Sequence, residues 1–246
     1  MNRFWTQTLV ALVAVVALAT VSPVQAGFIT TLPIWNGIQY AGGFGEPNTA
    51  TFGQTITVDA AQGTFLTDFT FQVATDPTDT SRFQAYVMAW DSANKLAIGN
   101  VLFQSGVITN VGPAVAPSPF VAINVVTNNL QLAANQEYVL FFNTSNNFDG
   151  STDFASFGSI DPDAYAGGSF VYNNNGDQFG ALLIDPWTLG YAGDDVNPPV
   201  ADLAFIANFS DAPVNPTPAP AGVVLFGLGF AGLGMFRSFR RSKVAA

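Results

Sequence analysis

The 246-residue chain contains neither cysteine nor histidine. Without cysteine, no disulfide can cross-link the fold, and no thiolate is available as a nucleophile or as a ligand for a soft metal. Without histidine, the chain lacks a common zinc ligand and the general base of a Ser-His-Asp triad. These absences exclude cysteine-nucleophile catalysis, triad hydrolysis and metal centres built from cysteine or histidine.

Basic residues are also scarce, and most of them lie at the two ends of the chain. Arg3 is close to the start, and the last ten residues contain Arg237, Arg240, Arg241 and Lys243. Residues 27–211 hold only two basic residues against seventeen acidic ones, which gives this region a net charge of −15. Because such a charge repels phosphate backbones, nucleic acid is not an expected partner.

Residues 1–26 have the pattern of an export signal. Arg3 precedes an eleven-residue apolar run, Leu9–Ala19, which is expected to be helical. Small residues at the −3 and −1 positions predict cleavage by signal peptidase between Ala26 and Gly27. An uncleaved anchor is the alternative, but eleven residues are short against the roughly 20 that span a bilayer.

The last 35 residues fall into three parts. Residues 212–221 form a proline-rich linker that cannot join a sheet. The apolar segment Gly222–Phe236 would span roughly 22 Å as a helix, so it predicts a short transmembrane helix. The basic residues in 237–246 follow at once and predict that this end stays in the cytoplasm while the rest of the chain is outside. A buried helix of the domain is the alternative, and the adjoining arginines disfavour it.

This order of parts resembles the PEP-CTERM sorting signal of Gram-negative bacteria that make extracellular polysaccharide. Pro216, Thr217 and Pro218 match its Pro-Glu-Pro-type motif, with threonine in place of glutamate. Pro218-Ala219-Pro220 is an alternative register of the motif. The resemblance implies that an exosortase in the inner membrane recognises the tail and removes the helix. The protein would then be delivered to the cell surface or the extracellular matrix.

Between the two ends, hydrophobic residues alternate with a period of two, which predicts β-strands. The run Glu137–Asn143 is continuously apolar over most of its length, as in a strand buried on both faces. The glycine-rich run Gly42–Gly45 and the pair Asn128-Asn129 are predicted to form turns. The predicted strands are Thr51–Val58, Thr64–Val73, Arg82–Trp90, Val101–Thr109, Phe120–Thr127, Glu137–Asn143, Ser169–Tyr172 and Asp202–Phe209.

Eight or nine short strands in residues 27–211 predict an all-β domain, a two-sheet antiparallel β-sandwich with a jelly roll as the favoured topology. Three sequence segments resemble those of galactose-binding-like ectodomains: Gly53–Val58, Phe83–Asp91 and Leu132–Phe142. That second resemblance supports a fold and assigns no ligand.

Carboxylates gather in a region rich in glycine and serine. Asp149, Asp153, Asp161 and Asp163 could supply oxygen ligands to a structural calcium ion, the only cofactor that the sequence suggests. The alternative is that these aspartates cap turns through their own backbone, which aspartate does routinely.

Aromatic residues suggest a second kind of site. Tyr86 and Trp90 would lie on the outward face of the predicted strand Arg82–Trp90, and Trp187 could join them in a flat platform for sugar rings. The alternative is that these large side chains belong to the core, as most do.

No residue pattern singles out a catalytic site, so the sequence predicts a protein that is not an enzyme. The leading hypothesis is an exported surface or matrix protein with a structural or adhesive sandwich. One alternative is a lectin-like module that binds exopolysaccharide. A matrix polysaccharide hydrolase with paired carboxylates is the other.

Overall fold

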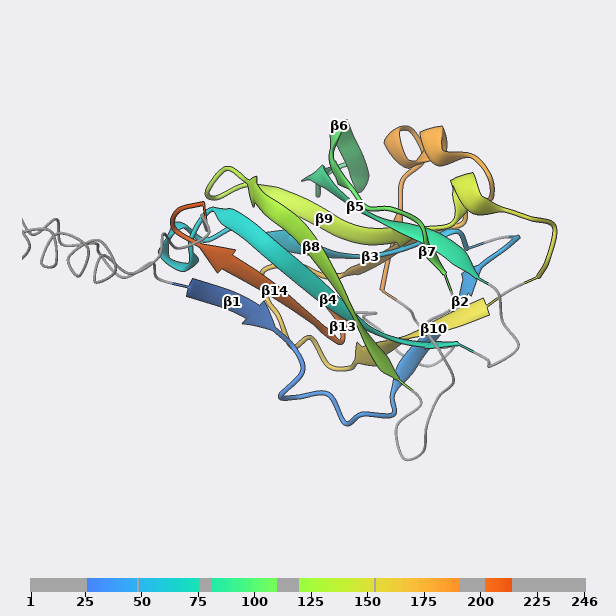
Figure 1. Cartoon of the computed structure of the whole chain (residues 1–246), viewed down its shortest axis with the longest axis horizontal. Helices are drawn as coiled ribbons and strands as arrows, with labels where there is room; N and C mark the ends of the chain where they lie inside the picture. The colour runs from blue at the N-terminus through green and yellow to red at the C-terminus, as the bar shows by residue number, and fades with distance from the viewer. Residues whose placement is uncertain are drawn as a thin grey trace, which may run out of the picture.

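The structure is a computed structural model, and it describes residues 26–47, 49–75, 81–109, 120–152, 154–190 and 202–213. These residues form two sheets that pack face to face (Figure 1). All pairs of named strands are antiparallel. The predicted all-β, two-sheet antiparallel sandwich is therefore confirmed.

One sheet, called here the front sheet, has seven strands. Its main path is β1-β14-β4-β10-β13, with β8 paired to β4 and β2 paired to β10. The strands are β1 (Ala26–Thr30), β2 (Tyr40–Gly45), β4 (Phe65–Thr75), β8 (Val121–Gln131), β10 (Phe154–Ile160), β13 (Asp202–Leu203) and β14 (Phe205–Ser210). The strands β1, β14, β4 and β8 lie side by side across the face turned to the viewer in Figure 1.

The other sheet, the back sheet, follows the order β12-β11-β3-β9-β5-β6, with β7 paired to β5. Its strands are β3 (Thr51–Thr57), β5 (Arg82–Asp91), β6 (Leu96–Gln104), β7 (Ile108–Thr109), β9 (Glu137–Asn143), β11 (Phe170–Asn173) and β12 (Thr188–Leu189). Three short 3-10 turns complete the described elements: η1 (Ala60–Gln62), η2 (Ser145–Asn147) and η3 (Phe179–Leu183).

Phenylalanine dominates the core between the sheets. Phe142 of β9 stacks on Phe83 with ring centroids 4.9 Å apart, and it meets Phe71 of the front sheet edge-on at 5.1 Å. Such offset and edge-to-face arrangements are the favoured ones for aromatic pairs. The neighbouring residue Phe141 points to the opposite face of the back sheet, into a second apolar cluster. The prediction that Glu137–Asn143 is buried on both faces is therefore confirmed.

Two of the predicted turns are wrong. Gly42–Gly45 belongs to β2, where Phe44 is fully buried and Gly43 has a φ of +90° that only glycine adopts readily. Asn128 and Asn129 take left-handed conformations inside β8, as a β-bulge after which pairing with β4 resumes at Leu130.

Strand boundaries also differ from the predictions. The expected strand Val101–Thr109 is divided between β6 and β7, and Asp202–Phe209 is divided at Ala204 between β13 and β14. The strands β1 and β10 were not predicted. A glycine such as Gly158 in β10 is more typical of a loop. A Cβ at this position would lie 2.7 Å from the Trp35 ring, so the close packing of Trp35 requires glycine.

The predicted signal helix in residues 1–26 and the predicted transmembrane helix in 222–236 lie outside the described residues, apart from Ala26 in β1. So do the linker motif Pro216, Thr217 and Pro218, and the basic cluster in 237–246. Among the residues that the structure describes, none forms a helix long and apolar enough to span a membrane.

The first and last strands of the sandwich pair with each other. Ala26 of β1 lies opposite Ser210 of β14, and the register continues to Thr30 opposite Ile206. The start of β1 and the end of β14 therefore lie together at one end of the molecule, on the left in Figure 1.

Candidate functional site

The outer face of the front sheet carries a row of side chains that crosses four strands. The register places Phe28 of β1 opposite Asn208 of β14, Asn208 opposite Asp68 of β4, and Asp68 opposite Val126 of β8. Neighbouring strands lie about 4.8 Å apart, so this row is roughly 14 Å long. We call it the Asp68 row.

A second row runs parallel to the Asp68 row, two residues further along each strand. It consists of Thr30, Ile206, Thr70 and Asn124, again in register across β1, β14, β4 and β8. Because side chains alternate between the two faces of a strand, both rows project from the same face. The two rows are separated by roughly 7 Å along the strands.

Asp68 is the centre of a hydrogen-bond cluster. Its Oδ1 accepts from Nδ2 of Asn208 at 2.7 Å and from Nδ2 of Asn124 at 2.9 Å. Its Oδ2 accepts from the Thr67 hydroxyl at 2.9 Å. Asn124 Nδ2 also donates to the Thr70 hydroxyl at 3.0 Å. A carboxylate in a central strand is unusual, because aspartate disfavours strands, and here neighbouring side chains hold it in place.

Two irregularities of the ladder border this cluster. Between β4 and β14 the register shifts after Asn208, so that Thr67 is an extra residue on β4. Between β4 and β8 it shifts beside Asp68, where Asn128 and Asn129 bulge. Bulges re-aim side chains and are frequent beside functional sites, and here they bring Thr67 and Asp68 to the same cluster.

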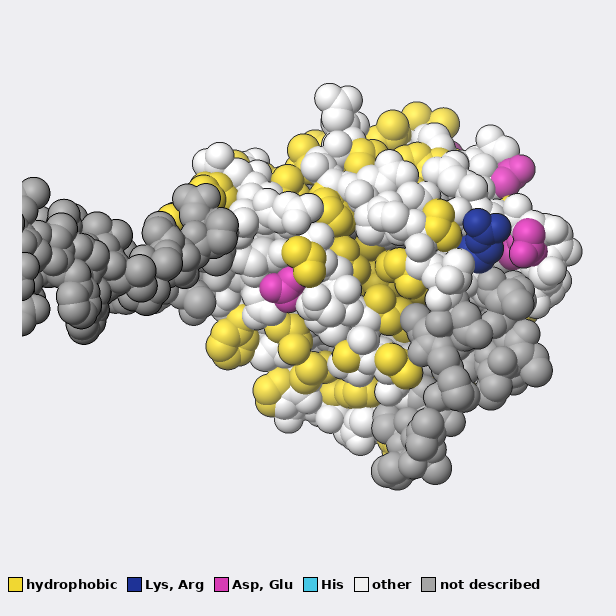
Figure 2. Space-filling view, viewed as in Figure 1, with side chains coloured by type: hydrophobic (Ala, Val, Ile, Leu, Met, Phe, Trp, Pro, Cys, Tyr) yellow, Lys and Arg dark blue, Asp and Glu magenta, His cyan; other side chains and the backbone are white. Residues whose placement is uncertain are grey.

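A shallow hollow covers this part of the face. Its volume is about 690 Å³, within the range of small-ligand sites, and both Phe28 and Asp68 line it. Phe28 is 60% exposed and Val126 is 61% exposed, so the Asp68 row has an accessible apolar side chain at each end. In Figure 2 this face is mainly yellow and white, which means apolar and uncharged polar side chains with few charges.

The predicted aromatic platform is wrong. Tyr86, Trp90 and Trp187 do come together, but they are 1%, 6% and 1% exposed. Trp187 meets Trp90 edge-on at 5.4 Å, and Tyr86 packs against Phe179 of η3 at 5.0 Å. These residues form a second core on the outer side of the back sheet.

The segment around η3 explains this burial. It folds over the outer face of β5 and β9, and Trp187 Nε1 donates to the Leu182 carbonyl at 3.0 Å. Burial raises the pKa of the Tyr86 hydroxyl, which also fits an interior position. The alternative that these aromatic residues are core is therefore the correct one.

The predicted calcium ligands do not converge on one point. Asp149 lies near the Glu46 end of β2, whereas Asp161 and Asp163 follow the far end of β10. The seven-residue strand β10 separates the two places by roughly 20 Å. Asp153 lies outside the described residues, and among those described no three acidic residues gather as a metal site would require.

Two of these aspartates instead cap their own turns. Asp149 Oδ1 accepts from the Ser151 N–H at 2.9 Å, and Asp163 Oδ1 accepts from the Tyr165 N–H at 3.1 Å. The bonds from Ser151 hold the pKa of the Asp149 carboxyl below its usual value. The prediction that Asp149 shares one calcium ion with Asp161 and Asp163 is therefore wrong, and the turn-capping alternative describes Asp149 and Asp163.

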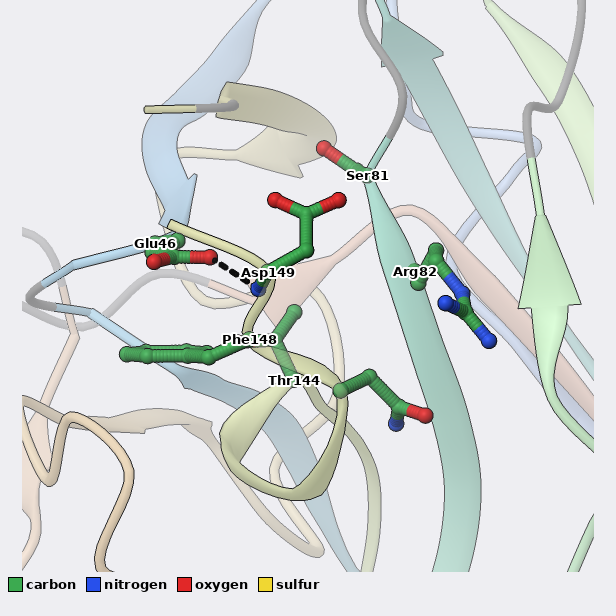
Figure 3. Close-up of a pocket in the computed structure, with 7 residues that line it drawn as sticks. Glu46, Ser81, Arg82, Thr144, Phe148 and Asp149 are labelled. Carbon is green, nitrogen blue, oxygen red and sulfur yellow. Dashed lines mark hydrogen bonds between the residues drawn. The ribbon is translucent and has the colours of Figure 1, made fainter. Parts of the chain in front are cut away.

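Glu46 and Asp149 both line a small pocket beside η2 (Figure 3). Glu46 accepts from the backbone N–H groups of Asp149 and Gly150 at 3.0 and 2.9 Å, which fixes this loop to β2. The cavity volume is about 10 Å³, room for about one water molecule. The buried Nδ2 of Asn147 has no acceptor among the described residues. The pocket is too small for a substrate.

The sequence places Asp68 and Thr70 on the polar face of a strand, but it contains no sign that Asn208 and Asn124 join them. Asn208 is 140 residues from Asp68 along the chain, and only the strand register brings the two together. An aspartate at an outward position of a phenylalanine-rich strand is the one signal that could have drawn attention to this face.

No model of a known protein family matches the chain, and no curated protein is similar enough to count as a relative. Among solved structures, the chain is similar to a clostridial cysteine protease, Cwp84 C116A after propeptide cleavage, with 13% identity and a TM-score of 0.49. That alignment covers 76% of this chain and 41% of the other.

A second structure is described as the cysteine protease and lectin-like domains of Cwp84, a surface layer associated protein of Clostridium difficile. It aligns with 12% identity and a TM-score of 0.41, over 67% of this chain and 32% of the other. This chain thus spans less than half of each of those proteins. Likenesses this weak carry no conclusion about activity, ligand or location.

Proposed function

We propose that the chain is an exported protein of the cell surface or extracellular matrix of a Gram-negative bacterium, with a non-catalytic adhesive or structural sandwich of jelly-roll type. Signal peptidase would remove residues 1–26, and an exosortase would act on the tail. The inner membrane would hold the protein only between these two steps. The export pattern, the three-part tail and the acidic middle region support this proposal.

The observation that carries the proposal is the pairing of β1 with β14. Because Ala26 lies opposite Ser210, both terminal segments join the sandwich at the same end. A domain attached in this way can stand away from a membrane while the rest of its surface is accessible. Cleavage between Ala26 and Gly27 would leave the pairs from Gly27 opposite Phe209 to Thr30 opposite Ile206 in place.

The sorting motif can be tested with a single substitution. Pro218 belongs to both registers of the motif, Pro216-Thr217-Pro218 and Pro218-Ala219-Pro220. Pro218→Ala is expected to leave the unprocessed protein in the inner membrane, because the exosortase would no longer recognise the tail. Membrane fractionation followed by immunoblotting of the envelope and the medium would measure this change.

Pro213→Ala is the matched control, because Pro213 lies in the same linker but outside both registers. It is expected to be processed and delivered like the natural protein. Equal delivery of the Pro218→Ala variant, the Pro213→Ala variant and the natural protein would contradict recognition through this motif.

A further inference from the structure

We propose that the outer face of the front sheet binds a neutral polysaccharide. The oxygens of Asp68, Asn124 and Asn208 accept hydrogen bonds from sugar hydroxyls, and the ring of Phe28 stacks on a sugar ring. This inference deepens the proposed function, because it names what an adhesive sandwich on the cell surface would hold. The proposed carbohydrate site is thus on the front sheet, and not at the aromatic cluster around Trp187, which is buried.

The Asp68 cluster has unused hydrogen-bond acceptors. Within the described part of the chain, no donor reaches Oδ1 of Asn124 or Oδ1 of Asn208, and each of these oxygens can accept two hydrogen bonds. Among the described residues only Thr67 donates to Asp68 Oδ2, which has a further lone pair. Sugar hydroxyls are donors that fit such acceptors, and the bond to the carboxylate would be charge-assisted.

The same cluster is arranged before any ligand arrives. Asp68 fixes the side-chain amides of Asn124 and Asn208 through their Nδ2 groups, so their oxygens have defined positions. A binding group that is already ordered loses less conformational entropy when the ligand binds. This argues for a binding function, since a purely solvated face does not need fixed amides.

The shape of the face fits an extended chain of sugars. The Asp68 row is roughly 14 Å long, and a hollow of about 690 Å³ lies over it. Phe28, at one end of the row, presents an accessible ring to the apolar face of a pyranose. Val126 provides an apolar contact at the other end.

Charge argues for a neutral ligand. Asp68 is the one charged side chain in the two rows, and residues 27–211 carry a net charge of −15. Anionic polysaccharides and phosphate groups would be repelled by both. A neutral polysaccharide meets no such repulsion and can still donate its hydroxyl groups to the carboxylate.

The test is affinity gel electrophoresis of the full chain, purified in detergent, through gels that contain dextran, galactomannan or xyloglucan, with anionic alginate as the comparator. At least one neutral polysaccharide is expected to retard the protein, and alginate is not. Phe28→Ala and Asn124→Ala are each expected to raise the dissociation constant about tenfold or more. Both residues are exposed, so the melting temperature should change little.

Tyr40→Ala is the matched control, because Tyr40 is an equally exposed aromatic residue on β2, outside the two rows. It should bind as the natural protein does. Retardation by none of the neutral polysaccharides, retardation by alginate alone, or equal binding by all variants would overturn the proposal. So would a Phe28→Ala change that separates a dimer without affecting polysaccharide binding, since the face would then join two copies.

This test is independent of export and sorting. A chain that is processed and delivered but binds no neutral polysaccharide would refute only the binding face. A chain that binds through Phe28 and Asn124 but remains full-length in the inner membrane would refute the proposed function and leave the binding face intact.

Discussion

Replacing Phe142 with alanine is expected to lower the free energy of unfolding by about 3–5 kcal/mol. Phe142 is fully buried between the sheets, and its ring touches Phe83 of the back sheet and both Phe71 and Phe157 of the front sheet. The substitution removes a contact that joins the two layers and leaves a cavity between them. For a domain of this size the melting temperature should fall by roughly 10 °C.

Phe28→Ala is the matched control for this substitution, because it makes the same chemical change on an exposed face. It should cost less than about 1 kcal/mol, the range of strand propensities. Urea unfolding of both variants, followed by intrinsic fluorescence, would give the two values. Similar losses for Phe142 and Phe28 would contradict the assignment of the core to the space between the sheets.

The second large effect is expected at Asp202, a carboxylate that is only 1% exposed. Its Oδ1 accepts from Gln54 Nε2 at 2.8 Å, and its Oδ2 accepts from the N–H groups of Ala164 and Tyr165, both at 2.8 Å. Gln54 in turn accepts from the Leu203 N–H through Oε1 at 2.9 Å. This network connects β3 of the back sheet to β13 and to the segment after β10.

Asp202→Asn should destabilise the protein by about 1–3 kcal/mol, the cost of a buried polar group without a partner. The asparagine Oδ1 can accept from both backbone N–H groups. Its NH2 group then faces the NH2 group of Gln54, and two donors cannot hydrogen-bond to each other. Flipping the side-chain amide of Gln54 would relieve this clash, but it would place the Gln54 NH2 group against the Leu203 N–H. One donor therefore stays unsatisfied in either arrangement.

The loss should depend on pH with a definite sign. Burial raises the pKa of Asp202 to about 6. In the unfolded chain this carboxyl is exposed to water and has its ordinary pKa of 3.8. Between these values the folded protein binds a proton that the unfolded chain does not, so stability from Asp202 increases as the pH falls from about 6 toward 4. Above pH 6 the carboxyl is ionised in both states, and this contribution is lost.

Unfolding free energies at pH 7.5 and pH 4.5 would measure this effect. The advantage of the natural protein over Asp202→Asn should be larger at pH 4.5, by about 1–3 kcal/mol. The other carboxyls are common to both proteins, so they largely cancel in the comparison. An advantage that shrinks as the pH falls would show that Asp202 is favoured as an anion, contrary to its burial.

The sequence predicted the structure correctly for strands whose own hydrophobic pattern shows which side chains are buried. The continuous apolar run in Glu137–Asn143 predicted a central strand, and the alternation in Thr64–Val73 placed Phe69 and Phe71 in the core. It failed where tertiary packing decides. In β10, Gly158 is required by the Trp35 ring, and no local pattern distinguishes such a glycine from one in a turn.

The candidate site was harder to foresee than the fold. A strand pattern shows that Asp68 faces outward, but the partners on β8 and β14 depend on the register between strands far apart in sequence. The aromatic prediction failed for a related reason. Nothing in the sequence around η3 indicates that it folds back over Tyr86 and Trp90 and removes them from solvent.

The proposed function requires that the exported chain is cut at both ends and that its sandwich stays folded. The most direct measurement is the intact mass of the protein recovered from the envelope or the medium. The mature protein is expected to begin at Gly27, with β1 still able to pair with β14, and to lack the apolar segment Gly222–Phe236. A mature protein that retains the whole tail through Lys243 would contradict the proposed function.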